Sequence, residues 1–245
     1  MDFVIQILHA LTIGTVKYGD SSLIVNCFTL EFGLQSYMLK GILTSKKNQK
    51  ISKSYFEPLT LLEIQAPQNQ ENKLGFIKEV KLEYAYQSLP FDMKKKAVLF
   101  FLAEVIQQVV REEPHENSGL YRFFKSRLLW LDAIEKVDLF HIKFMLDLTQ
   151  HIGFYPNLEN SHFPFFDLAS GCMSHVKTKV SIEGENKMYW GTLLGMKFDD
   201  QTKLNLDKEE KSKLLQHAIT YFELHLQQFK SPKSLKVLHE VFSTS

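Results

Sequence analysis

The chain has few cysteines and no long apolar run. Only two of its 245 residues are cysteines, Cys27 and Cys172, which is too few for a disulfide framework and favours a reducing cytoplasm. No apolar run approaches the roughly 20 residues that a membrane-spanning helix needs. The first residues have neither the basic start nor the small-residue cleavage site of a signal peptide. We therefore expect a cytoplasmic protein.

Motifs of the common catalytic sites are also missing. The sequence has no Gly-rich phosphate loop, no Gly-x-Ser-x-Gly elbow and no His-Glu-x-x-His. Its nine histidines are scattered, and its acidic pairs stand beside loops or helix ends. Cys172 and His175 are half of a zinc site at best, because structural zinc takes four ligands. We expect neither an enzyme nor a bound metal or cofactor.

What the chain does contain is a lysine-rich segment on a nearly neutral protein. Residues 40–53 include no acidic residue, whereas the formal net charge of the whole chain is only +1. The lysines of this segment are Lys40, Lys46, Lys47, Lys50 and Lys53. Such a local block of positive charge favours binding of a polyanion such as a nucleic-acid backbone. The alternative is an ordinary solvated loop.

The first eighty residues have the pattern of short strands. Runs rich in β-branched and aromatic residues are separated by turn signals such as Tyr18-Gly19-Asp20 and Glu31-Phe32-Gly33. The predicted strands span residues 8–16, 22–30, 34–39, 59–65 and 74–82. Five short strands over residues 1–82 favour a small closed or partly open barrel.

A barrel of this kind binds single strands by combining lysines with aromatic rings that stack on bases. Tyr18, Tyr37 and Tyr55 are the candidates for stacking, although each could instead pack in the core. A second basic cluster, formed by Arg122, Lys125 and Arg127 beside Phe123, could accept an acidic, apolar peptide tail. A solvated helix face is the alternative for that cluster.

From residue 83 the apolar spacing becomes helical. One helix is predicted to begin after an N-cap at Asp92, and a second after Asn117 or Ser118. A third is predicted from about Asp138 to a stop at Gly153. These helices define an expected helical domain over residues 83–153.

Residues 154–204 hold many of the glycines and prolines and predict a loop-rich insert with one hairpin. Asp207 and Glu210 have capping-box spacing for a further helix. Ser231-Pro232 predicts the start of a last short helix. The expected C-terminal segment, residues 205–245, would pack on the helical domain.

Several segments, taken in order, resemble the RecO family of bacterial recombination mediators. The likeness covers most of the chain, and its specificity comes from the order and spacing of the segments. The matching segments are Ile13 to Val25, Phe28 to Gly33, Lys40-Gly41 before the basic loop, Phe56-Glu-Pro-Leu59, and Leu146 to Leu158 with its Gly-x-x-Pro-x-Leu end.

The resemblance implies an α+β protein with an N-terminal OB-fold, a helical domain and a small zinc-ribbon-like insert. It also implies binding of single- and double-stranded DNA, annealing of complementary strands, and work with RecR and the single-strand-binding protein to load recombinase. Such a protein would be associated with the nucleoid. Many family members carry Cys-x-x-Cys pairs where this chain has Asn160 and His162, so we expect the zinc site to be absent. The insert would then be held by aromatic residues, which are Phe163, Phe165, Phe166 and Trp190.

These observations predict a DNA-binding repair protein that holds strands electrostatically and performs no covalent chemistry. The alternative is a protein-interaction adaptor of a replication or repair complex, with incidental DNA contact. A nuclease or hydrolase is the least favoured interpretation, because the chain shows no cluster of carboxylates.

Overall fold

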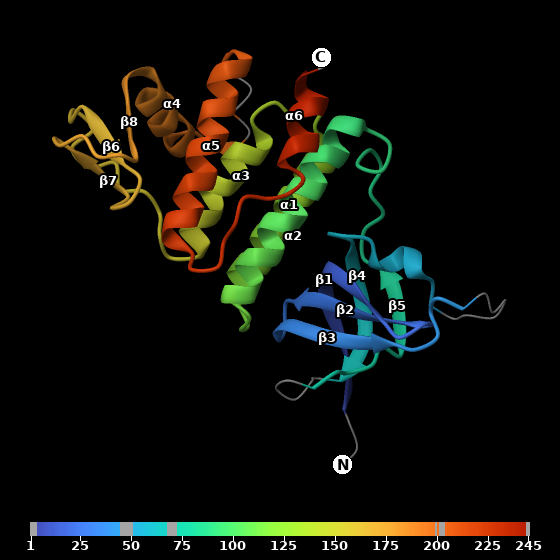
Figure 1. Ribbon diagram of the computed structural model, residues 1–245. Helices are drawn as coiled ribbons and strands as arrows, with labels where there is room; N and C mark the ends of the chain where they lie inside the picture. The colour runs from blue at the N-terminus through green and yellow to red at the C-terminus, as the bar shows by residue number, and fades with distance from the viewer. Residues whose placement is uncertain (1–3, 45–50, 68–72, 199, 201–203, 244–245) are drawn as a thin grey trace. The chain divides into compact units, whose positions relative to one another are not determined.

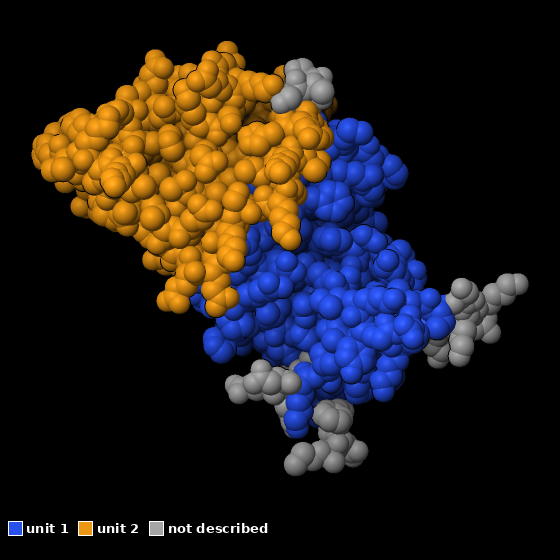
Figure 2. Space-filling view, in the orientation of Figure 1, with its two compact units in different colours: residues 1–133 blue, residues 134–245 orange. Residues whose placement is uncertain are grey.

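The computed structural model describes residues 4–44, 51–67, 73–198, 200 and 204–243. The chain forms two compact units, residues 1–133 and 134–245, which we call unit 1 and unit 2 (Figure 1, Figure 2). The division falls within residues 83–153. Its first two helices pack on the N-terminal sheet, whereas its third packs with the C-terminal helices.

Unit 1 begins with a five-stranded antiparallel sheet whose strands follow the order β3-β2-β1-β4-β5. All five predicted strands are present, but the last is shorter than predicted. The strands are β1 (Ile5–Tyr18), β2 (Ser22–Thr29), β3 (Gly33–Leu39), β4 (Leu61–Pro67) and β5 (Glu79–Leu82). The sheet is not closed into a barrel, so the closed form of the predicted barrel is wrong. Within the described residues, the segment before β5 meets β3 through an isolated bridge between Tyr37 and Gly75.

Buried apolar residues that alternate with more exposed ones along the strands form the core of unit 1. Inward-facing positions two residues apart bury apolar side chains, as a half-buried strand requires. Leu23, Val25 and Cys27 on β2 alternate with half-buried residues in this way. They pack with Leu8, Tyr37 and Ile64 of the neighbouring strands.

Two helices, α1 (Met93–Glu112) and α2 (Ser118–Ala133), complete unit 1. The Asp92 side chain accepts a hydrogen bond from the Lys95 amide at 2.9 Å, which confirms the predicted cap. For α2, the Asn117 side chain accepts from the Leu120 amide at 2.9 Å. Helix α2 packs on β2, where the rings of Phe28 and Phe124 meet edge to face with centroids 6.0 Å apart.

The connection between α1 and α2 is fixed to the β2–β3 hairpin at Gly33. This glycine has φ +64°, and a Cβ built on it would lie 2.4 Å from backbone atoms of Pro114 and His115. The next amide, of Leu34, donates to the Pro114 carbonyl at 2.8 Å. A side chain at position 33 would therefore separate the hairpin from the helical connection.

The segment between β5 and α1 is held by a carboxylate in the last turn of α2. Asp132 is 4% exposed and accepts hydrogen bonds from the amides of Gln87, Ser88 and Leu89 at 2.8, 2.8 and 2.9 Å. The buried Lys95 donates to the Asp132 carbonyl at 2.8 Å, which satisfies a backbone acceptor at the helix end. Burial raises the pKa of Asp132, but these backbone hydrogen bonds outweigh it and the net pKa is lowered.

Unit 2 contains α3 (Phe140–Leu148), the 3₁₀ turn η2 (Thr149–His151), α5 (Lys208–His225) and α6 (Leu235–Ser243). Gly153 has φ +85°, which fits the predicted helix stop. Asp207 and Glu210 form the predicted capping box. The predicted start of the last helix at Ser231-Pro232 is wrong. The Leu235 amide donates to the Pro232 carbonyl at 3.2 Å, so these residues form a turn before α6.

The insert has more regular structure than the predicted hairpin. Strands β6 (Phe165–Asp167), β7 (Cys172–Ser174) and β8 (Ser181–Glu183) form a sheet in the order β7-β6-β8, followed by α4 (Gly184–Gly195). Phe166 and Trp190 are fully buried, with ring centroids 5.7 Å apart, as the aromatic expectation required. Both rings also pack on Tyr221 of α5, which ties the insert to the helices of unit 2.

Candidate nucleic-acid interface

Basic and aromatic residues lie at one end of the sheet in unit 1. The register pairs Lys17 with Leu23, and Leu23 with Leu39, so Lys17 and Lys40 lie at the same end of three adjacent strands. Tyr18 closes β1 at this end, before the turn at Gly19. All three side chains are exposed, and Tyr18 is 57% exposed. Lys17 was not among the sequence candidates, and the strand register is what identifies it.

The turn after β3 is anchored to the turn between β1 and β2. The Gly41 amide donates to Ser22 Oγ at 3.3 Å, and the Leu43 amide donates to the Ser21 carbonyl at 2.9 Å. The lysine segment therefore leaves the sheet from a fixed position beside Tyr18. Asp20, also exposed, is an acidic residue in the same turn.

The lysine segment returns to the sheet through the 3₁₀ turn η1 (Lys53–Phe56). Phe56 is buried and Tyr55 packs against the same core, while Lys53 remains exposed. Lys46, Lys47 and Lys50 lie outside the described residues. Within the described part of the chain, Lys17, Lys40 and Lys53 make no ion pair, so their charges are available to an anion.

Two of the three tyrosines proposed for base stacking are placed in or against the core. Tyr37 has no exposed surface, and burial, followed by the charges of Cys27 and Glu31, raises its pKa. The stacking role predicted for Tyr37 is therefore wrong, because its ring is enclosed by the core. Its position two residues before the inward-facing Leu39 is the sequence signal that would have shown this. Tyr55 is half-buried, which leaves Tyr18 as the exposed ring of the three.

The basic cluster on α2 does not form the predicted peptide surface. Phe123 is buried, and the Arg127 guanidinium lies over its ring, 5.4 Å from the centroid. The Lys125 ammonium pairs with Glu83, which also accepts from His9 Nδ1 at 2.9 Å. Arg122 remains exposed. The apolar part of the predicted site is thus part of the core of unit 1, and Lys125 serves an ion-pair cluster.

The insert does not bring its cysteine and histidines together as a zinc site would. Cys172 is half-buried with its Sγ 3.5 Å from the Ser170 carbonyl, while the His175 ring packs against Phe163 at a tilt of 36°, with centroids 3.5 Å apart. The His162 and His175 ring centroids are 6.5 Å apart. Among the described residues, no group of three or more His, Cys, Asp or Glu side chains is placed to hold a metal ion. The residues present do not fit a zinc ribbon.

Two family models of known proteins together match most of this chain. The family model for the N-terminal part of recombination protein O matches residues 5–86, and that for its C-terminal part matches residues 90–235. The chain belongs to the RecO family. The N-terminal RecO domain is an OB-fold, which is the class to which the sheet of unit 1 therefore belongs.

Curated RecO relatives match nearly the whole chain. The DNA repair protein RecO of Flavobacterium psychrophilum is 38% identical over 235 residues, which cover 96% of this chain and 98% of the relative. The RecO proteins of Christiangramia forsetii and Bacteroides fragilis are 37% and 31% identical, with coverage of 95% and 96% of this chain and 97% and 96% of theirs. The chain thus has the general role of this family, DNA repair by recombination. In the described part of the chain, no helix combines the length and apolarity that a membrane crossing requires.

Proposed function

We propose that this RecO protein binds single- and double-stranded DNA at the basic end of the unit 1 sheet and anneals complementary strands there. The observation that carries the proposal is the position of Lys17, Tyr18 and Lys40 at one end of the sheet, beside the turn that leads into the lysine segment. Lysines that follow a backbone beside an exposed ring are the combination that single-strand binders use. The family resemblance supports the same function.

The protein would act by holding strands rather than by covalent catalysis. Phosphate contacts make such binding nearly independent of sequence and strongly dependent on salt. With a formal net charge of only +1, the whole protein attracts the DNA phosphates only weakly. The basic end of the sheet must therefore supply the affinity for DNA. We propose that partners therefore assist: a RecR-like mediator, the tail of the single-strand-binding protein and, indirectly, the recombinase filament.

Fluorescence anisotropy with a labelled single-stranded oligonucleotide across a salt series tests this proposal. The variant combines Lys46→Glu, Lys47→Glu and Lys50→Glu, and a second variant combines Lys17→Glu with Lys40→Glu. We expect both to weaken binding strongly and to flatten the salt dependence, since each lost phosphate contact reduces the slope of log K against log salt by about 0.7. A strand-annealing assay on the same proteins then measures the second part of the proposal.

The matched control reverses three lysines in unit 2, Lys230, Lys233 and Lys236, for the triple variant and only Lys233 and Lys236 for the double variant, so the net charge changes equally in each comparison. We expect this control to bind nearly as well as the wild type. Equal loss in the control would show that only net charge matters, and it would overturn the placement of the site. A folded wild-type protein that fails to bind at low salt would instead favour the adaptor function.

The adaptor function is the second candidate, and one observation favours it. Unit 1 contains an apolar pocket, of about 350 Å³, that is unlike a phosphate-binding surface. Under this function, partner proteins would bind normally to the charge-reversal variants of the basic end.

A further inference from the structure

The first half of β1 has one unpaired edge. β4 pairs with β1 from Ile5 onward, whereas β2 pairs with it only from Ala10. Figure 1 shows the start of β1 extending past β2 toward the N-terminus. A strand that is paired on one side only leaves the backbone N–H and C=O groups of alternate residues without a strand to bond.

The position of His9 identifies the backbone groups that face this edge. His9 faces away from β4, because its carbonyl accepts a hydrogen bond at 2.9 Å from the amide of Leu30, the residue after β2. Ile7 and Ile5 lie two and four residues before His9, so their N–H and C=O groups point to the same side. Among the described residues, no group bonds to them on that side. We call Ile5–Ile7 the open edge.

The side chains along the open edge are apolar and exposed. Val4, Ile5 and Ile7 are 73%, 39% and 58% exposed. Edge strands are commonly protected by a lysine, a proline or a bulge, and residues 4–8 have neither of these residue types nor an irregular register with β4. Such an edge is the feature onto which an extended peptide adds as a further strand.

Charge narrows the class of partner. Both carboxylate oxygens of Glu31 accept from the His9 amide at 3.1 Å, so a negative charge lies at the end of the open edge. Within the described residues, no lysine or arginine pairs with Glu31. Residues 1–8 include no lysine or arginine either, so a second copy of this edge would leave Glu31 without a cation. A partner strand with a basic residue at that position would supply one.

We propose that the open edge binds an extended segment of a protein partner as an added strand. The partner's backbone would bond to the N–H and C=O groups of Ile5 and Ile7, with its apolar side chains beside theirs and a lysine or arginine beside Glu31. The proposed DNA site lies at the opposite end of β1, where Lys17 pairs with β2, so this assignment goes beyond DNA binding and does not depend on it.

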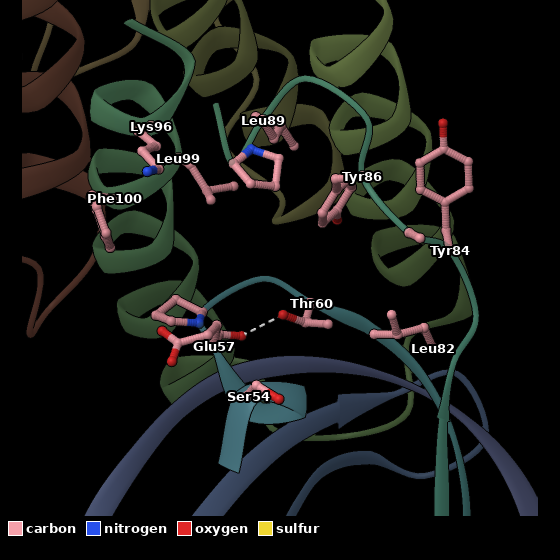
Figure 3. Close-up of a pocket in the computed structure, with 13 residues that line it drawn as sticks. Ser54, Glu57, Thr60, Leu82, Tyr84, Tyr86, Leu89, Lys96, Leu99 and Phe100 are labelled. Atoms are coloured by element: carbon pink, nitrogen blue, oxygen red, sulfur yellow. Dashed lines mark hydrogen bonds between the residues drawn. The ribbon is translucent and has the colours of Figure 1, made fainter. Parts of the chain in front are cut away.

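The apolar pocket of unit 1 is a separate feature. Figure 3 shows Thr60 and Glu57 on one side of that pocket, with Tyr86 and Leu89 on the other. Thr60 immediately precedes β4, whereas the open edge pairs with the last residues of β4. The pocket therefore lies toward the opposite end of that strand and supplies a control position.

The test measures binding of fluorescein-labelled heptapeptides to the full chain by anisotropy. The first peptide is Lys-Thr-Val-Thr-Ile-Thr-Lys, whose two end lysines allow one to meet Glu31 in either strand direction. One twin carries glutamate at both ends, and a second is N-methylated at the amides of its two apolar residues. We expect the first peptide to bind at least about fivefold more tightly than either twin, because one twin loses the charge pair and the other loses its backbone donors.

Substitutions then place the peptide on the protein. Ile7→Lys should weaken binding by about tenfold or more, since it removes an apolar contact and repels the peptide. The matched controls are Val16→Lys, 55% exposed in the paired half of β1, and Phe100→Lys, 49% exposed in the pocket. Both should bind like the wild type, and circular dichroism establishes that each variant is folded. Should Ile7→Lys fail to fold, Glu31→Gln decides alone: it must lose the preference for lysine ends, while Glu79→Gln keeps it.

Amide hydrogen exchange, followed by NMR on the labelled protein, gives a readout specific to strand addition. The lysine-ended peptide should slow the exchange of the Ile5 and Ile7 amides, because these donors become hydrogen-bonded, and should leave the amide of Val16 unchanged. Unchanged exchange at both isoleucines with the peptide bound would overturn the assignment.

Other results would overturn it as well. These are no binding of the lysine-ended peptide, equal binding of all three peptides, equal loss in Val16→Lys, and loss in Phe100→Lys, which would place the peptide in the pocket. Sedimentation in which the wild type dimerises and Ile7→Lys does not would assign the edge to a second copy.

Titration with the labelled oligonucleotide separates the open edge from the proposed function. The lysine-ended peptide should leave oligonucleotide binding unchanged. Competition between the two would make the edge part of the DNA site, against the assignment. If the oligonucleotide never bound but the peptide did, DNA binding would fail while the assignment of the edge stood.

Discussion

The two units keep a titratable side chain inside a folded core in opposite ways. In unit 1, Asp132 stays ionised because three backbone amides donate to it. In unit 2, His141 on α3 is buried against Phe242, and its pKa is lowered to about 3 by burial and then by the nearby positive charges of His239 and Lys211. Unit 1 thus depends on a buried charge, whereas unit 2 depends on a buried group staying neutral.

Because of this difference, we expect acid to lower the free energy of unfolding of the two units over different pH ranges. The folded-state pKa of Asp132 is lowered, so its stabilisation is present above its unfolded pKa of about 3.9 and is lost below it. The folded-state pKa of His141 is also below its unfolded value, about 6.5. Unfolding then takes up a proton, and the stability of unit 2 falls as pH decreases from about 6.5 toward 3.

The largest expected effect comes from removing the buried charge. Asp132→Ala would leave the amides of Gln87, Ser88 and Leu89 without their side-chain acceptor. Each buried donor without an acceptor costs about 1–3 kcal/mol, so we expect a loss of about 3 kcal/mol or more in the free energy of unfolding of unit 1. Urea unfolding with Trp130 as the reporter measures it, in a Trp190→Phe background. The control, Glu79→Ala, removes an exposed carboxylate of unit 1 that accepts from Gln65 Nε2 at 3.0 Å, and it should cost less than about 1 kcal/mol. Similar losses in both variants would contradict the role given to the backbone donors.

A smaller effect is expected from acid on unit 2. Between pH 6.5 and 5 its free energy of unfolding should fall by about 2 kcal/mol through His141, because each pH unit between the two pKa values costs about 1.4 kcal/mol. Urea unfolding at several pH values, followed by Trp190 in a Trp130→Phe background, measures this slope. His141→Leu should flatten it, whereas His239→Leu, at an exposed position, should leave most of it. An unchanged slope in His141→Leu would assign the acid sensitivity to other groups, such as His217, whose pKa is also lowered by burial.

Local features of this chain could be predicted from its sequence, and contacts between distant segments could not. The caps at Asp92 and Asp207 and the stop at Gly153 depend on neighbouring residues, so they were predictable. Asp132 binds a segment 43 to 45 residues earlier in the chain, and no local pattern indicates that pairing. The strands of the insert have three residues each, which is too short to show an alternation.

The residues of the candidate site also fall into those that local sequence could predict and those that depend on distant contacts. The lysine segment was evident from composition, and alternation along β3 was sufficient to place Tyr37 inside. Lys125 seemed available because its partner Glu83 lies 42 residues away in sequence. The apolar pocket of unit 1 was not predictable, because its lining comes from segments far apart in sequence that meet only in the folded unit.

The smallest expected effect is on DNA affinity, and it compares an exposed tyrosine of each unit. Tyr18 in unit 1 and Tyr155 in unit 2 have similar exposure, 57% and 45%, but only Tyr18 lies beside the basic end of the sheet. If Tyr18 stacks on a base, Tyr18→Ala should weaken single-stranded DNA binding by about 1 kcal/mol, roughly fivefold in Kd. Tyr155→Ala should leave Kd unchanged, and Tyr18→Phe should keep most of the affinity because stacking needs the ring and not the hydroxyl. Anisotropy at fixed salt measures all three variants. Equal affinities would mean that the lysines hold the strand by charge alone, and the salt dependence of Tyr18→Ala would then match that of the wild type.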